Sequence, residues 1–260
     1  MQPCLFIRLW LNCVRMRTKT GTKPERPAAG RIRGVVFDVD GTLYDQSLLR
    51  IILAVRLVGA LIAHPIRTSR DIKIVSHYRK HQEALRGQRL TVKGLRRKQA
   101  AMTAASAGSD LHTVEKTVAA WMENIPCRSM ALCRRPGLTD VFQVLKQNGY
   151  RLGILSDYPS EGKLQALGVR SFVDAVLCTS DPAVGNFKPH PRGFRAIARR
   201  MGLPTGRILY VGDRSDVDAA GALSAGMKTV LVRSGIPWHR GGGIPRCAIR
   251  RIPDYVEGIR

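Results

Sequence analysis

The second half of the sequence constrains the fold most strongly, because short apolar runs alternate there with stretches of helical periodicity. Runs that are apolar at nearly every position are typical of strands buried on both faces of a parallel sheet, with helices as the connections. The pattern therefore predicts an α/β fold with a doubly wound parallel sheet. We expect strands at 151–156, 175–178, 207–211 and 228–232, and helices at 139–148, 160–167, 191–201 and 216–226.

One further strand is expected much earlier, at 33–37, where GVVF follows Arg33. The region between this strand and 151–156 has no clear strand in its first part, and Gly and Pro divide it into helical stretches. The sheet therefore carries a helical insertion directly after its first strand. The helical stretches of the insertion are 46–64, 68–86, 90–107 and 110–124.

These patterns divide the chain into four parts. The α/β core takes residues 32–45 and 136–235, and the helical insertion takes 46–135. Residues 1–31 are Arg-rich and lack periodicity, which indicates a flexible basic leader. This leader is either an organelle transit peptide or the result of an upstream start, with Met16 as the alternative start. Residues 236–260 are expected to form a basic C-terminal tail.

Two features bear on the compartment of the protein. Six cysteines occur without a C-x-x-C pair or a zinc-type spacing, which favours the reducing cytoplasm. The apolar run 51–63 has thirteen residues interrupted by Arg56, whereas a membrane span needs about 20 apolar residues. We therefore expect no membrane span, and a buried or interfacial helix at this position.

The net charge of +24 indicates an anionic partner, such as a nucleic acid, an anionic membrane surface or a phosphorylated substrate. The insertion holds seventeen Lys and Arg against five Asp and Glu. This excess either steers a polyanionic substrate or forms a solvated basic surface, and the stretch 86–98 is the best candidate for substrate contacts. Residues 34–45 are the exception, because they contain three Asp and no Lys or Arg.

Polar side chains follow the carboxyl ends of four expected strands. Ligands bind at this edge in open α/β sheets, so these side chains are the candidate site residues. They are Asp38, Asp40 and Thr42 after 33–37, Ser156 at the end of 151–156, Lys188 beyond 175–178, and Asp213 and Asp218 after 207–211.

Four motifs carried by these residues, FDVDGTLYD, ILSD, FKPHP and YVGDRSDVDAAGALSAGM, occur in an order that resembles the haloacid dehalogenase (HAD) superfamily. The resemblance covers roughly 33–45 and 136–232 by motif, and the insertion by its placement. It implies a Rossmann-like core and an inserted α-helical cap that closes over the active site and excludes water.

The resemblance implies that Asp38 is a nucleophile that forms an aspartyl-phosphate. It also implies a Mg²⁺ ion held by Asp38, Asp213, Asp218 and the backbone carbonyl of Asp40, which would neutralise the charge of the phosphate. Phosphate oxygens would be bound at Gly41, Thr42, Ser156 and Lys188.

Asp40 is implied to be the general acid and base, which protonates the leaving alkoxide and then takes a proton from the attacking water. This role needs a raised pKa, which the crowding of neighbouring carboxylates would produce.

Two positions depart from the family pattern. Asp216 is an alternative to Asp218, and Asp218 either binds the metal, directly or through water, or orients Lys188. Asp157 follows Ser156 where relatives commonly have Asn, which leaves the role of Ser156 open.

The expected function is a Mg²⁺-dependent phosphatase, similar to phosphoglycolate phosphatase-like enzymes, that acts on a small phosphorylated metabolite. No expectation about the oligomeric state or the natural substrate follows from the sequence. A phosphomutase acting on a sugar phosphate would share all four motifs and is the alternative. A protein that binds an anionic polymer on the same fold is a weaker alternative, and no specific nucleic acid is expected because no basic patch interleaved with aromatic residues is evident.

Overall fold

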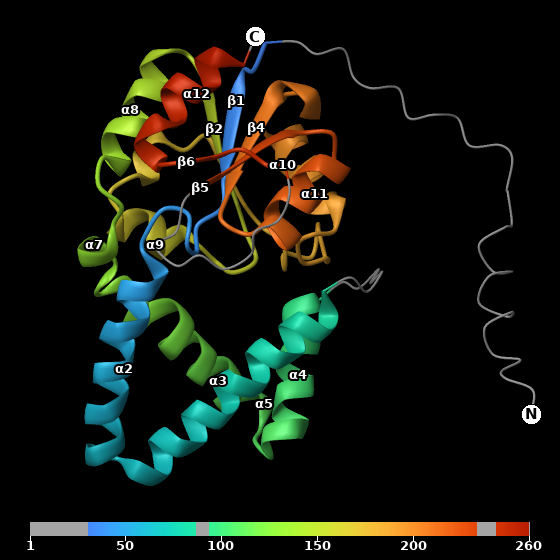
Figure 1. The fold of residues 1–260 in the computed structure, drawn as a ribbon. Coiled ribbons are helices and arrows are strands. Elements are labelled where there is room, and N and C mark those ends of the chain that lie inside the picture. The colour runs from blue at the N-terminus through green and yellow to red at the C-terminus, as the bar shows by residue number, and fades with distance from the viewer. Residues whose placement is uncertain (1–30, 87–93, 233–242, 260) are drawn as a thin grey trace, which may run out of the picture.

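The structure is a computed structural model that describes residues 31–86, 94–232 and 243–259. Within these ranges a parallel sheet flanked by helices forms the core, and the inserted helices α2–α5 gather at one end of the sheet (Figure 1). The expected doubly wound sheet with a helical insertion is therefore confirmed. The expected leader lies outside the described residues except for Arg31, and so does the part 87–93 of the basic stretch.

The sheet has six strands in the order β3-β2-β1-β4-β5-β6, and every neighbouring pair is parallel. The chain leaves β1 for β2 and β3 on one side and later returns to β4 on the other side. Ligands in open α/β sheets bind beyond the carboxyl ends of the strands where the order reverses, here between β1 and β4. The strands are β1 Gly34–Phe37, β2 Arg151–Ser156, β3 Ala175–Cys178, β4 Ile208–Gly212, β5 Lys228–Val232 and β6 Arg246–Cys247.

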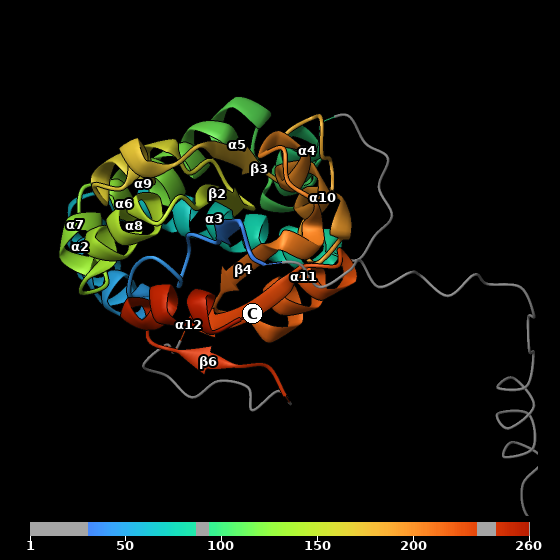
Figure 2. The same cartoon turned by 90° about the horizontal axis from the view of Figure 1, so that it is seen from above.

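Helices cover both faces of the sheet, as Figure 2 shows from above. Val35 and Phe37 of β1 pack on one face, where the Phe37 ring stacks on Phe142 at 4.8 Å between centroids. Val36 points to the other face and packs in a cluster with Phe194. Burial on both faces explains why the strand is continuously apolar. The covering helices are α8 Leu138–Gln147, α9 Glu161–Ala166, α10 Pro191–Arg200, α11 Ala220–Ser224 and α12 Ile252–Gly258.

The inserted helices have a small core of their own. Ile74 and Tyr78 from α3 pack there with Ala100 from α4 and with Val114 and Val118 from α5. The insertion therefore folds as a helical unit placed over the end of the sheet. Its helices are α2 Gln46–Ala63, α3 Pro65–Leu85, α4 Leu95–Ala107, α5 Leu111–Val118, α6 Ile125–Cys127 and α7 Met130–Cys133, with a π-helical turn at Ala119–Asn124.

Of the two alternatives expected for 51–63, a buried or an interfacial helix, helix α2 is not the buried one. Asp45 caps its N terminus by accepting hydrogen bonds from the backbone N–H groups of Ser47 and Leu48, yet Leu49 is its only buried residue. Among the described residues it is the one helix long and apolar enough to cross a membrane by length and composition, with a mean hydropathy of 1.8 and 6% of its residues buried. Packing inside the protein therefore does not account for its apolar sequence.

The C-terminal segment also differs from the expected basic tail. Residues 236–242 lie outside the described part, but Arg246–Cys247 adds a sixth parallel strand to the sheet beside β5. Ile249, Ile252 and Val256 are buried in the same apolar cluster as Phe142. These three positions follow helical spacing, and the surrounding arginines hid that pattern in the sequence.

The packing of α12 predicts a stability effect at Ile252, which is fully buried. Ile252→Ala should lower the free energy of unfolding by about 2–5 kcal/mol, because it removes buried methyl groups and leaves a cavity. The matched control is Ile66→Ala, since Ile66 is 88% exposed and its truncation should change stability by less than about 0.5 kcal/mol. Urea unfolding measures both, and equal midpoints would show that α12 does not contribute to the cooperative core.

Candidate active site

The turn after β1 brings Asp38 to the reversal point of the sheet. Phe37 is in register with Val211 of β4, so the residues that follow the two strands leave the sheet at the same level. Gly41 makes this turn possible, because it has a φ of 89° and a Cβ atom there would lie 2.2 Å from an Asp213 carboxylate oxygen. Only glycine satisfies both the positive φ and the close approach.

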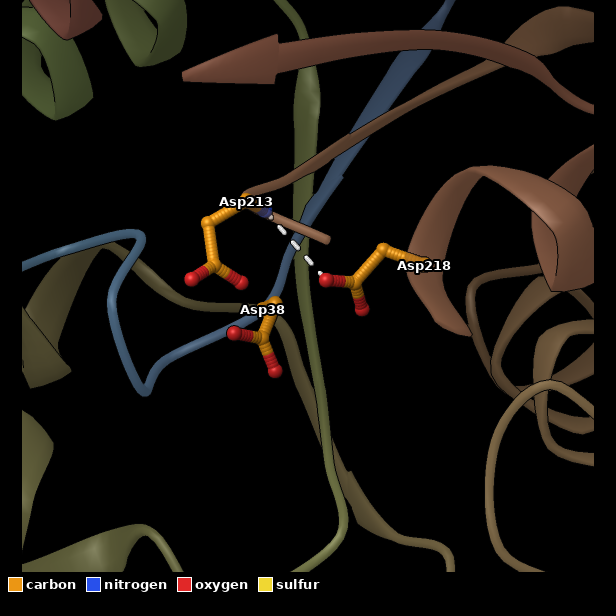
Figure 3. A group of neighbouring side chains, drawn as sticks. All are labelled: Asp38, Asp213 and Asp218. Atoms are coloured by element: carbon orange, nitrogen blue, oxygen red, sulfur yellow. Dashed lines mark hydrogen bonds between the residues drawn. The ribbon is translucent and has the colours of Figure 1, made fainter. Parts of the chain in front are cut away.

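Three carboxylates meet at this point, from Asp38, Asp213 and Asp218 (Figure 3). One oxygen from each lies within 4.8 Å of the others. Asp38 follows β1, Asp213 follows β4, and Asp218 lies in the π-helical turn Ser215–Ala219 beyond β4. Residues separated by up to 180 positions in the chain thus form one acidic cluster, as the positions of their motifs predict.

Lys188 is the cation of this cluster. Its buried Nζ donates to Asp38 Oδ1 at 2.6 Å, to Asp218 Oδ1 at 2.7 Å and to the hydroxyl of Tyr210 at 3.2 Å. Burial alone would lower the pKa of Lys188, but Asp218 and Asp38 outweigh burial and raise it well above the usual range. Lys188 is therefore charged, and it bridges two of the three carboxylates.

One ammonium does not neutralise three carboxylates, and the pKa values reflect this. Burial raises the pKa of Asp38 to about 7, against the opposing effect of Lys188 and with a further contribution from Asp218. Burial, Asp218 and Asp38 together raise the pKa of Asp213 to about 8. A cluster of carboxylate oxygens with excess negative charge has the chemistry that a hard divalent cation such as Mg²⁺ requires. The donor set thus fits the implied metal.

The geometry distinguishes Asp218 from Asp216. Asp218 is buried and accepts hydrogen bonds from the backbone N–H groups of Asp213 at 3.2 Å and Arg214 at 3.1 Å. Burial would raise the pKa of Asp218, but Lys188 above all, then the Arg214 backbone N–H and the Tyr210 hydroxyl, outweigh burial and lower it. The Asp216 side chain is 62% exposed and pairs with Arg214. The structure thus brings Asp218 into the cluster and places Asp216 outside it.

Asp40 has a different environment from the one expected. Its Oδ1 accepts hydrogen bonds from Lys163 Nζ at 2.5 Å and from the Tyr44 hydroxyl at 2.5 Å. Burial would raise the pKa of Asp40, but Lys163 and the hydrogen bond from Tyr44 outweigh it and hold the pKa below its usual range. The expectation of a raised pKa is therefore wrong for this arrangement. The Lys163 cation from α9 has a larger effect on this pKa than the neighbouring carboxylates do.

Lys163 was missed because no motif contains it. It lies in the first half of α9, and its side chain is only 5% exposed. A lysine on a short helix carries no local signal of a partner 123 positions away. Only the packing of α9 beside the turn after β1 makes the pair.

The remaining expected phosphate contacts lie around the same point. Thr42 is fully buried and its hydroxyl donates to Asp38 Oδ2 at 3.3 Å. Ser156 ends β2, is buried, and its hydroxyl accepts a hydrogen bond from the Tyr158 backbone N–H at 3.3 Å. Thr42 thus contacts the nucleophile candidate directly, whereas Ser156 supports the loop that follows β2.

Asp157, the departure in the second motif, links the core to the cap. Its carboxylate accepts hydrogen bonds from Arg86 at 2.6 Å, from the Thr179 hydroxyl at 2.6 Å and from the Lys188 backbone N–H at 3.1 Å. Arg86 lies at the C-terminal end of α3 and also donates to the Lys188 backbone carbonyl at 2.7 Å. A carboxylate at this position, unlike an amide, can neutralise the half-buried guanidinium of Arg86. The aspartate that replaces the usual asparagine at position 157 therefore pairs with a cap residue, Arg86.

A cavity of about 260 Å³ lies where the cap meets the core, with the acidic cluster in its wall. Asp38, Asp213 and Asp218 line it together with Lys188. This volume suits a small molecule rather than a polymer. The cap and α9 contribute further lining side chains, among them Arg50, Arg79, Arg86, Trp121 and Lys163.

Comparison with known proteins identifies the family. The model of haloacid dehalogenase-like hydrolases matches residues 32–226. The glyceraldehyde 3-phosphate phosphatase of Methanopyrus kandleri is 30% identical over 207 residues, which are 78% of this chain and 85% of the relative. The phosphoglycolate phosphatase of Shigella dysenteriae is 28% identical over 203 residues, which are 74% of this chain and 78% of the relative.

Solved structures share the fold. A 2-haloacid dehalogenase from Pseudomonas syringae superposes with a TM-score of 0.61 at 21% identity, over 88% of this chain and all of that one. A HAD phosphatase from Thermococcus onnurineus gives a TM-score of 0.60 at 21% identity, over 87% of this chain and 99% of that one. From the family match and the relatives, the chain belongs to the haloacid dehalogenase-like hydrolases and is an enzyme of the phosphatase type.

Proposed function

We propose that this enzyme is a Mg²⁺-dependent phosphomonoester hydrolase that acts on a small phosphorylated metabolite through an aspartyl-phosphate on Asp38. The observation that carries the proposal is the position of Asp38. Its carboxylate lies in the wall of the cavity, beside the Lys188 ammonium and within 4.8 Å of two further carboxylates. A carboxylate attacks a doubly negative phosphate only where positive charge is concentrated at the point of attack.

Asp38, Asp213 and Asp218 would hold the metal with their side chains, and Asp40 would hold it with its backbone carbonyl. Mg²⁺, when bound, supplies the positive charge that allows two anions to approach each other. Gly41 keeps the space beside Asp213 open, and Gly212 does the same for Asp218, where a Cβ atom would lie 2.4 Å from the Asp218 side chain. Gly41 and Gly212 thus allow the carboxylates of Asp213 and Asp218 to take the positions proposed for the metal ligands.

The phosphoryl oxygens would be bound by Lys188, by the Thr42 and Ser156 hydroxyls and by backbone N–H groups near Gly41. In the first step Asp38 forms a bond to phosphorus, the bond from phosphorus to the ester oxygen breaks, and the leaving oxygen takes a proton from the protonated form of Asp40, which becomes the carboxylate. The pairing with Lys163 and Tyr44 makes this protonated form the minor one before the reaction. In the second step Asp40 takes a proton from water, the water oxygen bonds to phosphorus, and the bond from phosphorus to the Asp38 oxygen breaks, which releases inorganic phosphate and restores the Asp38 carboxylate. The pairing of Asp40 with Lys163 and Tyr44 favours the carboxylate form, which the second step needs.

The cavity and the relatives both support the proposed substrate class. Two relatives are named for glyceraldehyde 3-phosphate and for phosphoglycolate, which are both small phosphomonoesters. A cavity of about 260 Å³ with arginine side chains in its wall suits a compact anion. We place the reaction in the cytoplasm, which agrees with four free cysteines in the described part of the chain.

The first test is a substrate panel. The purified protein should release inorganic phosphate from p-nitrophenyl phosphate and from small aliphatic phosphomonoesters, EDTA should abolish the release, and added Mg²⁺ should restore it. Conversion of one sugar phosphate into another without phosphate release would support a phosphomutase instead. Salt-dependent binding of DNA with no hydrolysis of any phosphomonoester would overturn the proposal.

The second test separates the acidic residues. Asp38→Asn should lower kcat by at least about a thousandfold, because an amide is not a nucleophile toward phosphorus. Asp218→Asn should also lower activity strongly, since it removes an anionic partner of Lys188. Asp216→Asn is the matched control, and the exposed position of its side chain predicts a change of less than about twofold. Activity retained in Asp218→Asn and lost in Asp216→Asn would contradict the assignment of the fourth motif.

The third test uses pH. Because the folded-state pKa values of Asp38 and Asp213 lie near 7 and 8, the folded metal-free protein keeps protons that the unfolded chain releases near its usual carboxyl pKa of 3.8. These two groups therefore make stability fall as pH rises from about 4 to about 8, by linkage. Mg²⁺ competes with these protons, so the increase in Tm on adding Mg²⁺ should be larger at about pH 8 than at about pH 6.

Thermal unfolding with Mg²⁺ or with EDTA measures this difference. Asp213→Asn should reduce the pH dependence of the Mg²⁺ effect, whereas Asp216→Asn should leave it as in the parent protein. An equal increase in Tm at both pH values would show that the acidic cluster does not bind the ion.

A further inference from the structure

Helix α2 carries more than half of the exposed large apolar residues among the described residues. Six of their eleven exposed large apolar side chains lie on this one helix, and the side chains of Val55 and Ile62 are 69% and 80% exposed. Isolated surface apolar residues are common, but a contiguous group of them marks an interaction site. The six residues are Leu48, Ile51, Val55, Val58, Leu61 and Ile62.

These side chains form a stripe on the outer side of α2. At about 100° per residue, Ile51, Val55 and Ile62 point in nearly one direction, with a stripe length of about 20 Å from Leu48 to Ile62. Leu49 and Leu53 lie on the opposite side of the helix, where they line the catalytic cavity. Figure 1 shows α2 at the edge of the molecule, with its outer side turned away from the other helices of the cap.

The charged residues of α2 and of the start of α3 are all of one sign as far as Arg70, which pairs with Asp71 at 3.9 Å. Residues 46–70 contain four arginines and no Asp or Glu, and each of the four is exposed. A complementary surface must therefore be both apolar and anionic. A second copy of this chain does not meet that condition, because the same acid-free segment would bring arginines toward arginines. The four residues are Arg50, Arg56, Arg67 and Arg70.

We infer that α2 binds the surface of an anionic lipid bilayer as an interfacial helix. The apolar stripe enters the boundary between head groups and acyl chains, and Arg56 and Arg67, which do not line the catalytic cavity, contact lipid phosphates. This inference does not depend on the proposed reaction, because the stripe and the cavity use opposite sides of the helix.

The structure also shows why α2 lies on the bilayer and does not cross it. Eighteen residues make a helix of about 27 Å, slightly shorter than the hydrocarbon layer of about 30 Å. Both ends are tied to folded parts of the protein. At the first end, Asp45 caps the helix and Leu49 packs in the main core. At the other end, the Thr68 hydroxyl of α3 donates to the Ala60 backbone carbonyl at 2.9 Å. A transmembrane position would require these contacts to break.

Co-sedimentation of the full-length protein with lipid vesicles tests the inference. The protein should sediment with vesicles that contain phosphatidylcholine and phosphatidylglycerol, and much less with vesicles of phosphatidylcholine alone. The combined variant Ile51→Ser, Val55→Ser and Ile62→Ser should bind the anionic vesicles at least about tenfold more weakly. It retains the basic residues 1–33, so loss of binding would not result from that segment.

The matched control combines Leu132→Ser, Val144→Ser and Leu223→Ser, three exposed apolar residues on other helices, and it should bind as the parent protein does. Both variants should keep the parent Tm and the parent rate of hydrolysis of a soluble phosphomonoester. Equal binding by the parent and by the α2 variant would overturn the inference. Absence of vesicle binding, together with a dimer of the parent protein that the α2 variant loses, would assign the stripe to a second copy.

Discussion

The buried charge balance around Lys188 is the interaction on which the rest of the site depends. Charges removed from water are costly unless they are paired, and here a single ammonium bridges Asp38 and Asp218 at the carboxyl edge of the sheet. Asp213 makes no such contact with Lys188, and burial together with the charges of Asp218 and Asp38 raises its pKa. The site therefore holds three carboxyl groups and one ammonium, and a bound divalent cation would supply the positive charge that balances them. Gly41 and Gly212 leave the space that lets Asp213 and Asp218 lie this close to the other charged groups.

The cap takes part in the same network through its longest helix. Arg86 at the end of α3 pairs with Asp157 and with the carbonyl of Lys188, so a contact between cap and core also orders the segment that carries the central cation. Glu83 on the same turn of α3 lies 3.5 Å from Arg214, next to the fourth motif. Movement of the cap would thus change contacts to three of the four motif segments at once, at Asp157, Lys188 and Arg214. The acidic side chain of Asp157 therefore holds the cap to the core through Arg86.

Much of the fold could be predicted because its signals are local. The expected strands 151–156, 175–178 and 228–232 coincide with β2, β3 and β5, since buried parallel strands are continuously apolar and end at polar residues. The sixth strand and α12 could not be predicted in this way. Their apolar residues are few and lie among arginines, and their burial depends on an apolar cluster contributed by distant helices. The exposure of α2 was hidden for a similar reason, because an apolar run alone does not show whether another element covers it.

By itself the sequence determined which residues stand at the carboxyl ends of the strands, because strand ends and motif spacing are properties of short segments. Only the tertiary structure decided which of these residues meet and in what charge state. It selected Asp218 over Asp216 by burial, and it paired Asp40 with Lys163 across 123 positions. Electrostatic energies depend on distances through space and on exclusion of water, and neither quantity is set by neighbours along the chain. Short sequence motifs thus determine which residue types reach the site, and the fold determines the protonation state and the contact partners of those residues.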